Sequence, residues 1–443
     1  MHQPLKAWFY LLSEFLNLIC LSQNIKENVS QTCLMKIPAF KSSTIRNVIR
    51  HSVLYAHQHL HLSIHHHHLS HIIQVNMSSS FLRSWSAPAD TWTLSLRRFE
   101  GASGAAIAVS TSSGGLTLLS AELSPVGSIS AHEASISGIT KVDESTLASS
   151  SSDGVKVWDL RQASSKPQFS LSSARKSNFL SIACSGTTLA AGTELAGQDA
   201  ELYVWDLRNT ESPLRLFADS HHDDISSVNF HQSLPYVVSG CTDGNVLVQK
   251  LDEPDEDEAL HQVIPFASVH SCSFSKPNRI SVLSHMETLA FFELNSTDYE
   301  THEEPPAHEL GDVRAIWPDC EYVVDIYQDY AAFGANSRNS LSIVPFDAAT
   351  EKFDLGRRVA FPDAHGSEVV RDVLLWGETV YSAGEDGLVK AWRMPEDTED
   401  KETKNRDKKR KEQEKHRRKQ GLRSKNGEKR EKSDRKANRF KPY

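Results

Sequence analysis

The sequence predicts an all-β protein built from several similar units, and three observations support this prediction. From about Thr91 onward, short apolar runs alternate with Ser, Gly and Asp turns, which is typical of many short strands. One strand–turn–strand pattern returns at a spacing of about 40 residues, which indicates a repeat architecture. Long helical patterns are few. We therefore expect each repeat to contribute one small sheet.

The clearest unit, HEASISGITKVDESTLASSSSDGVKVWDLR, ends at Arg161. It predicts strands over residues 136–140 and 146–151, and a third strand after a tight Asp153-Gly154 turn. Asp-Gly between alternating apolar residues favours a hairpin, because the turn needs a positive φ that glycine adopts freely. Related units occur at residues 189–208, 221–251 and 365–394.

These units resemble the WD-repeat family, whose repeats each form one four-stranded blade of a β-propeller. Weaker copies that lack the Trp lie at residues 105–120, 280–294 and 322–347. Counting the units by their spacing gives seven blades over residues 91–394, with six or eight as alternatives. The resemblance therefore implies a seven-bladed WD-repeat β-propeller.

Two neighbouring stretches resemble the WD repeat-containing protein 89 family more narrowly. They are AGTELAGQDAELYVWDLR at residues 191–208 and SHHDDISSVNFHQSLPYVVSGCTDGNVLVQKLDEPDEDEAL at residues 220–260. In that family a lengthened third blade leads into a His-x-Asp-Asp blade and then an acidic stretch. This resemblance covers roughly residues 95–395 and bears on the fold more than on the role.

The last unit ends at Trp392 without a fourth strand after it, and an acidic linker follows. Residues 91–96 (TWTLSL) precede the first unit and alternate as a strand does. We expect this segment to complete the last blade, because joining the two ends of the chain in one sheet removes an exposed edge.

In the WD-repeat family, a His before the first strand of a blade, a Ser or Thr on the second, an Asp in the next turn and a Trp on the third form a buried hydrogen-bond network. The resemblance implies such structural sets in the second, last and fourth blades. Their members are His132, Ser149, Asp153 and Trp158; His365, Ser382, Asp386 and Trp392; and His221 or His222 with Ser239 and Asp243. The fourth blade has Gln249 where Trp is expected, and the third has Asp199 and Trp205 but no obvious His. Because the same trio recurs, we interpret it as structural and not as a Ser-His-Asp hydrolase site.

The charge of −9 is unevenly distributed along the chain. Residues 401–443 carry +13 and residues 1–76 carry +4, which leaves −26 on residues 77–400. A field of that size attracts basic partners such as a ribosomal protein or a histone. The densest acidic stretch is an expected exposed loop made of Asp252, Glu253, Asp255, Glu256, Asp257 and Glu258. The alternative is a solvated loop that keeps the protein in solution.

The segment 395–443 reads as a charged linker followed by a disordered basic tail. Its two basic clusters resemble a nuclear import signal, and contact with RNA is the alternative. The clusters consist of Lys408, Lys409, Arg410, Lys411, Arg417, Arg418 and Lys419. We therefore expect the protein in the nucleus or nucleolus, with the cytoplasm as a further location. The tail could also fold onto the acidic body and screen it.

Consecutive units each end in Trp-Asp-Leu-Arg. This pattern resembles the Trp-Asp-x-Arg motif of substrate receptors for cullin-RING ubiquitin ligases, in which the Arg contacts a propeller adaptor. The residues are Trp158, Asp159 and Arg161, followed by Trp205, Asp206 and Arg208. The alternative is that Arg161 and Arg208 only pair with nearby acids.

Residues 1–76 differ from the rest and hold ten of the 21 histidines. A signal peptide at residues 8–21 is opposed by Glu14 within the apolar run. A metal-binding tract at residues 65–68 is a weaker alternative. We expect a disordered or dispensable extension, with Met77 beginning the functional polypeptide.

Motifs for catalysis and cofactor binding are missing from the sequence. It has no P-loop, no Gly-x-Gly-x-x-Gly after a strand and no His-Glu-x-x-His, and the six cysteines show no metal-ligand spacing. No apolar run reaches the roughly 18–20 residues that a membrane span needs. We predict a non-enzymatic protein-interaction scaffold without cofactor or metal, acting as a monomer or within a larger complex and linked to ribosome assembly. A ubiquitin-ligase receptor is the alternative, and an enzyme is the third hypothesis.

Overall fold

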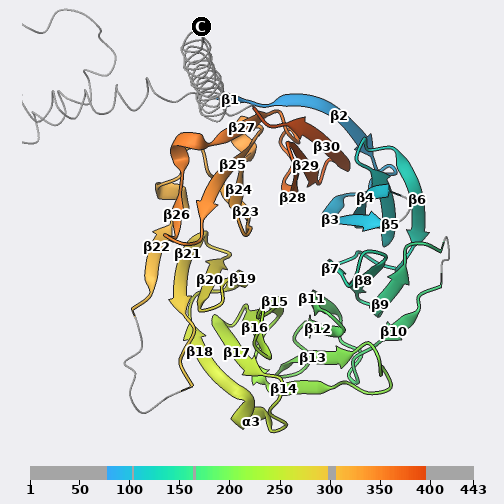
Figure 1. Cartoon of the computed structure of the whole chain (residues 1–443), viewed down its shortest axis with the longest axis vertical. Helices are drawn as coiled ribbons and strands as arrows, with labels where there is room; N and C mark the ends of the chain where they lie inside the picture. The colour runs from blue at the N-terminus through green and yellow to red at the C-terminus, as the bar shows by residue number, and fades with distance from the viewer. Residues whose placement is uncertain (1–76, 102–103, 163–165, 298–305, 396–443) are drawn as a thin grey trace, which may run out of the picture. The chain divides into compact units, whose positions relative to one another are not determined.

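The computed structural model describes residues 77–101, 104–162, 166–297 and 306–395, which form seven small sheets arranged in a ring (Figure 1). The predicted seven-bladed β-propeller is confirmed. In each blade the first strand of the unit is the innermost strand, and the blades are numbered here from the sheet that contains residue 93. Within these ranges no helix has both the length and the apolar character that crossing a membrane requires.

Blades 1 to 4 are regular four-stranded antiparallel sheets. Blade 1 contains β3 (Thr93–Gly101), β4 (Gly104–Thr111), β5 (Gly115–Ser120) and β6 (Pro125–Ser130). Blade 2 contains β7 (Gly138–Lys141), β8 (Thr146–Ser151), β9 (Gly154–Asp159) and β10 (Phe169–Leu171). Blade 3 contains β11 (Phe179–Ser185), β12 (Thr188–Thr193), β13 (Ala200–Asp206) and β14 (Arg215–His221). Blade 4 contains β15 (Ile225–Phe230), β16 (Tyr236–Cys241), β17 (Asn245–Lys250) and β18 (Leu260–Pro265), with the one-turn helix α3 (Glu256–Ala259) before β18.

Blade 5 is also a four-stranded sheet, whereas blade 6 has two additional short strands and blade 7 takes its outer strand from the N-terminal part of the described chain. Blade 5 contains β19 (Val269–Lys276), β20 (Arg279–Ser284), β21 (Thr288–Glu293) and β22 (His308–Asp312). Blade 6 contains β23 (Tyr322–Ile326), β24 (Tyr330–Ala335), β25 (Ser340–Asp347) and β27 (Val359–Pro362), together with the short strands β26 (Lys352–Phe353) and β1 (Met77–Ser78). Blade 7 contains β28 (Val370–Trp376), β29 (Thr379–Gly384), β30 (Leu388–Arg393) and β2 (Ser80–Ser86). Three short 3₁₀ helices, η2 (Val313–Ala315), η3 (Asn336–Arg338) and η4 (Leu355–Arg357), lie in or next to blade 6.

The middle strands of the blades are buried on both faces, because each blade is covered by a neighbour on either side. All six residues of β8 and all six of β16 are buried. A strand covered on both faces loses the apolar–polar alternation of a half-exposed strand. This explains why burial in these two strands does not alternate with a period of two, and why polar side chains such as Ser149 lie in the interior.

Asp-Gly turns separate the second and third strands of blades 2 and 7. Gly154 has φ 115° and Gly387 has φ 74°, a backbone region that L-residues with a Cβ rarely adopt. A Cβ on either glycine would lie 2.5 Å from a carbonyl oxygen, of Leu171 or of Thr91 respectively. Glycine is therefore required there both by conformation and by space.

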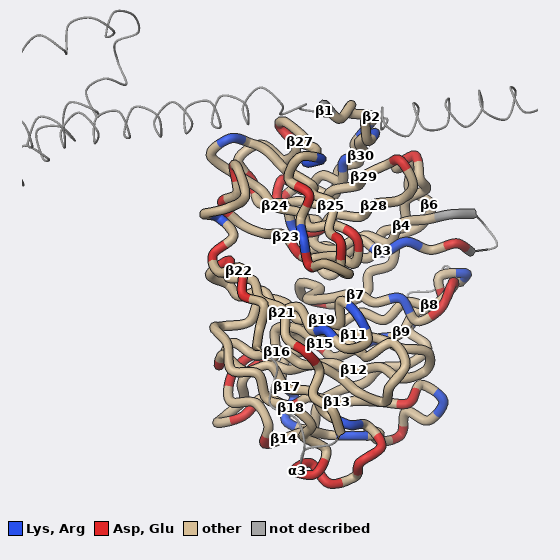
Figure 2. Tube along the Cα trace, turned by 60° about the vertical axis from the view of Figure 1, so that its left-hand side comes forward, with Lys and Arg blue, Asp and Glu red and all other residues tan. Residues whose placement is uncertain are grey.

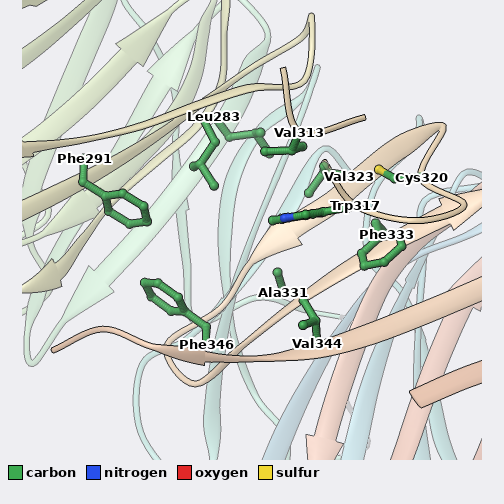
Figure 3. Packing of buried hydrophobic residues seen from close by; sticks show 11 residues of the cluster. Leu283, Phe291, Val313, Trp317, Cys320, Val323, Ala331, Phe333, Val344 and Phe346 are labelled. Atoms are coloured by element: carbon green, nitrogen blue, oxygen red, sulfur yellow. The ribbon is translucent and has the colours of Figure 1, made fainter. Parts of the chain in front are cut away.

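The hydrophobic core is divided into clusters that lie between neighbouring blades. Between blades 5 and 6, Phe291 stacks on Phe346 with ring centroids 5.6 Å apart, and Trp317 packs against Phe333 at 5.2 Å (Figure 3). A further cluster joins blade 7 to blade 1 through residues such as Tyr381 and Leu96. Adjacent blades therefore bury apolar surface all around the ring, including where the chain closes it.

The strand that closes the ring differs from the prediction. β2, and not residues 91–96, is the outer strand of blade 7 and pairs antiparallel with β30. Thr93 begins β3, the innermost strand of blade 1, where its hydroxyl bonds the carbonyl oxygens of Gly384 and Leu388 at 3.1 and 2.9 Å. The propeller therefore begins before residue 91, the start expected from the sequence, because β2 (Ser80–Ser86) is its closing strand.

Candidate docking surfaces and the polar clasps of the blades

The four residues expected to form a network in blade 2 are brought together. His132 Nε2 lies 2.7 Å from the Ser149 hydroxyl, and Trp158 Nε1 donates to the same oxygen at 2.9 Å. The Asp153 carboxylate hydrogen-bonds His132 Nδ1 and also pairs with Lys156 at 2.7 Å. Burial lowers the pKa of His132, against the opposing effect of Asp153. We call this network of His, Ser, Asp and Trp a clasp, and in blade 2 each of its polar groups has a partner.

Blade 7 carries the same clasp. His365 contacts Asp386 through Nδ1 at 2.6 Å and Ser382 through Nε2 at 2.8 Å. Trp392 Nε1 donates to the Ser382 hydroxyl at 3.3 Å. The His, Ser, Asp and Trp expected from the sequence therefore act as one unit in both blades.

Blade 4 has only part of this arrangement. His221, and not His222, contacts Ser239, at 2.7 Å through Nε2. The Asp243 carboxylate accepts the backbone N–H of His222 at 3.1 Å and of Asn245 at 2.7 Å. Gln249, in the place of Trp, donates to the Ser220 hydroxyl at 3.1 Å. Two buried atoms, His221 Nδ1 and Gln249 Oε1, have no hydrogen-bond partner among the described residues.

Blade 3 replaces the clasp with a network that the sequence reasoning missed. Glu201 on β13 is buried, pairs with Arg175 at 3.0 Å and accepts the Tyr203 hydroxyl at 2.8 Å. Trp205 stacks on Tyr203 at 5.2 Å. Asp199, the expected clasp acid, instead pairs with His222 at 2.9 Å. A carboxylate at a buried strand position, as in AELYVW, is the signal that could have pointed to this network.

The clasps can stabilise the blades, but a substrate cannot reach them. Ser149, Ser239 and Ser382 are each fully buried. A nucleophilic serine must approach a reacting carbonyl, which a closed interior position prevents. The geometry therefore fits the structural interpretation of these Ser-His-Asp sets.

The acidic stretch at residues 252–258 is partly ordered by its own carboxylates. Asp255 caps helix α3 by accepting the N–H groups of Asp257 and Glu258 at 3.0 and 3.2 Å. Glu256 accepts the N–H of Ala218 at 3.0 Å. The side chains of Asp252, Asp257 and Glu258 are exposed, and Figure 2 shows acidic residues gathered around α3. The stretch is therefore a fixed turn that presents three carboxylates in addition to the exposed capping residue Asp255, and not a fully free loop.

Most of the basic side chains of the propeller are already paired. Lys and Arg number 22 between residues 77 and 400, and more than half of them contact a carboxylate. Those that do so are Arg97, Arg98, Lys141, Lys156, Arg161, Arg175, Arg208, Arg279, Arg314, Arg338, Arg358, Arg371 and Lys390. The cations of the propeller therefore sit beside particular acids and leave the other carboxylates uncompensated.

A polar cavity of about 290 Å³ opens between the inner strands β15, β19 and β23. Its one charged lining residue is Asp325, among serine hydroxyls and the amides of Asn229 and Gln328. Asp325 Oδ1 accepts the Ser271 hydroxyl and the Ile326 N–H, both at 2.8 Å. Burial raises the pKa of the Asp325 carboxyl. The cavity can accept a cationic group, which would favour the ionised carboxylate.

The two Trp-Asp-x-Arg segments have the same geometry. Arg161 forms a bidentate pair with Asp159, at 2.8 Å for both contacts, and its side chain is 67% exposed. Arg208 pairs with Asp206 at 2.6–3.1 Å and is 76% exposed. Trp158 and Trp205 are buried in the core. Both arginines therefore pair with a neighbouring acid and still face solvent at the ends of β9 and β13.

The candidate import signal at residues 408–411 and 417–419 lies outside the described residues. So do the histidine-rich run and the apolar segment within residues 1–76.

Comparison with known proteins finds similarity to WD-repeat proteins. The family model "WD domain, G-beta repeat" matches residues 212–248. A WD repeat-containing protein of Saccharomyces cerevisiae is 44% identical over 252 residues, which cover 56% of this chain and 63% of the yeast protein. A WD repeat-containing protein of Schizosaccharomyces pombe is 29% identical over 280 residues, which cover 58% of this chain and 83% of that protein. The narrower resemblance to WD repeat-containing protein 89 stays a prediction.

The fold is also similar to a solved structure. The crystal structure of the Cps50 (Swd1) β-propeller domain of Myceliophteria thermophila matches 71% of this chain and 99% of that domain, with a TM-score of 0.54. The two sequences are 12% identical over this match, so the likeness shows a shared fold and nothing more.

Proposed function

We propose that this WD-repeat propeller is a non-enzymatic scaffold that docks a basic protein on its acidic surface, within the nucleus or nucleolus. The observation that carries the proposal is the turn at α3, which presents Asp252, Asp257 and Glu258 to solvent on a body of charge −26. Propellers commonly present rigid loops to other proteins. The charge and not the fold therefore defines the class of partner.

Electrostatics determine how such docking would behave. Carboxylates without a local cation attract a basic chain over a distance of about one Debye length, roughly 8 Å at physiological salt. Association is then fast at low salt and weakens as salt rises. Basic ribosomal proteins and histones have the complementary charge, and a ribosome-assembly role is consistent with this.

The cavity beside Asp325 offers a second contact to the same partner. A lysine or arginine side chain that enters it would meet one carboxylate and several hydroxyl and amide groups. A cation that is buried and hydrogen-bonded in this way adds specificity that an exposed acidic turn alone does not provide.

Affinity purification of the full chain at two salt concentrations tests the proposal. Proteins recovered at moderate salt should be enriched in basic sequences, and this enrichment should fall as salt rises. A chain without residues 401–443 should lose nuclear localisation while it retains the same partners. Partners of ordinary charge, or unchanged localisation of the shortened chain, would contradict the proposal.

A second candidate function, a substrate receptor of a cullin-RING ubiquitin ligase, is favoured by the matching Asp159–Arg161 and Asp206–Arg208 pairs. Arg161→Ala combined with Arg208→Ala should abolish co-purification of the propeller adaptor. Arg314→Ala is a matched control, because Arg314 forms the same kind of exposed pair with Asp312 in blade 5. Unaltered recovery of the adaptor by the double variant would exclude this role.

A further inference from the structure

One cluster in blade 4 combines the three side-chain types that bind zinc. A ring nitrogen of His221, the Cys241 sulfur and an Asp243 carboxylate oxygen all lie within 4.8 Å of one another. His221 and Cys241 are fully buried, and Asp243 is half-buried. Cys241 ends β16 and Asp243 lies in the turn that follows it, while His221 ends β14 of blade 3, so two backbone segments from neighbouring blades hold the cluster.

Comparison with the other clasps shows what is unusual about this cluster. In blades 2 and 7, Nδ1 of the clasp histidine is hydrogen-bonded to Asp153 or Asp386. Nδ1 of His221 has no partner among the described residues, although the ring is fully buried. Leaving such an atom unpaired is unfavourable in a folded protein, because the atom loses its hydrogen bond to water and gains none in return. The position of Cys241 is occupied by Ser151 in blade 2 and by Gly384 in blade 7. The thiol and the orphaned nitrogen therefore occur together, in blade 4.

The hydrogen bonding of His221 suits a metal ligand. Its Nε2 is engaged with the Ser239 hydroxyl at 2.7 Å, which leaves Nδ1 as the free nitrogen. A histidine that binds a metal through one nitrogen commonly has the other held by a hydrogen bond.

We propose that His221, Cys241 and Asp243 form a zinc site in blade 4, with Nδ1, Sγ and a carboxylate oxygen as ligands and water in the fourth position. Zinc takes nitrogen, sulfur and oxygen ligands together in tetrahedral sites. The ligands of a tetrahedral zinc lie roughly 3.3–3.8 Å apart. A pair of atoms at the 4.8 Å limit of this cluster would therefore have to approach by about 1–1.5 Å. The thiol, which now donates to the Asp223 carbonyl at 3.1 Å, would give its proton to solvent on binding. A metal here would give the buried Nδ1 of His221 a partner, as Asp153 and Asp386 do for the clasp histidines of blades 2 and 7.

Cobalt(II) substitution tests this site in the full chain. The purified protein is stripped with a chelator and titrated with Co²⁺ alone, because a Co²⁺–thiolate bond gives a charge-transfer band in the near ultraviolet. We expect this band to saturate at one Co²⁺ per chain and to disappear when Zn²⁺ is added. If the wild-type chain shows no thiolate band with excess Co²⁺, the proposal is wrong.

Single substitutions test which residues bind the metal. Cys241→Ser should remove the band, and Asp243→Asn should weaken Zn²⁺ binding by about tenfold or more. Cys184→Ser is the matched control, because Cys184 is half-buried on β11 in blade 3, and it should leave the band unchanged. Serine already stands at the equivalent place in blade 2, so Cys241→Ser should fold, and thermal melts check both variants. The proposal is wrong if the Co²⁺–thiolate band is still present in Cys241→Ser. It is also wrong if Asp243→Asn binds Zn²⁺ as tightly as the wild-type chain, because either result would assign the metal to other residues.

Discussion

The ring of Phe81, near the start of the described chain, lies edge-on to the ring of Trp392 near its end, with centroids 5.3 Å apart and planes at 69°. The two residues are also paired in register across β2 and β30. Trp392 in turn belongs to the clasp of blade 7, through its bond to Ser382. One contact therefore links the closure of the ring to the polar network of the last blade.

Deleting residues 80–86 should open the ring. Without β2 the backbone of β30 becomes an unpaired edge, which promotes self-association. We expect oligomers by size-exclusion chromatography with light scattering. We also expect a melting temperature lower by about 5 °C or more, since 1 kcal/mol corresponds to roughly 2–4 °C for a large domain. Arg83→Ser, a change at an exposed side chain of the same strand, is the control that should remain monomeric.

Ser149→Ala should destabilise the propeller more than a change at another buried serine. It removes the partner of both His132 Nε2 and Trp158 Nε1, so two buried polar groups lose a hydrogen bond, and we expect a loss of about 2–4 kcal/mol. Ser110→Ala is the matched control, because the buried Ser110 hydroxyl has no hydrogen-bond partner in the described residues, and it should change stability by less than about 0.5 kcal/mol. Urea denaturation measures both. Equal losses would show that the clasp does not stabilise blade 2.

Stability should fall as the pH drops from 7 to 5. Burial lowers the pKa of His132, His261 and His285 below the ordinary value of 6.5. In this range the unfolded chain binds protons that the folded chain does not, so acid favours unfolding. The stabilisation is complete above pH 6.5 and is lost as the pH falls toward the lower folded values. The urea midpoint measured in steps of pH should decrease over this range, and a midpoint that rises below pH 6.5 would contradict the assignment.

Asp325→Asn should weaken capture of a basic partner by about tenfold, because the cavity loses the charge of its carboxylate while the volume is preserved. Asp329→Asn is the control, since Asp329 is an exposed acid four residues further along the chain. Quantitative pull-down at fixed salt compares the two variants. Equal recovery would show that the partner does not use the cavity.

Local patterns in the sequence predicted much of the fold. The spacing of the units and the Asp-Gly turns gave seven blades, because each unit encodes its own sheet and its own turn chemistry. His132 and His365 each lie 17 residues before the clasp serine and 21 before the clasp Asp, so a repeated spacing identified both sets. The resemblance of these units to WD repeats then led to the prediction that the sheets are arranged in a closed ring.

Features that depend on contacts between distant segments were not predictable in the same way. Residues 91–96 alternate as a strand does, whereas residues 80–86 (SFLRSWS) do not, and only the geometry of the closed ring selects the latter as the outer strand of blade 7. The pair of Glu201 with Arg175 joins positions that share no motif. The cavity at Asp325 needs three inner strands from three blades. The proposed metal site in blade 4 was not predicted, because His221, Cys241 and Asp243 follow no familiar metal-binding spacing.

The most direct test of the docking account removes charge at α3 and leaves the turn intact. The variant Asp252→Asn, Asp257→Asn, Glu258→Gln retains the cap at Asp255 and the contacts of Glu256. A control variant, Glu211→Gln, Glu309→Gln, Glu378→Gln, removes the same number of charges at exposed sites in other blades. Quantitative mass spectrometry of proteins captured by the full chain should show basic partners reduced about tenfold or more by the first variant and little changed by the second. Equal capture by the two variants would contradict the claim that this acidic turn docks the partner.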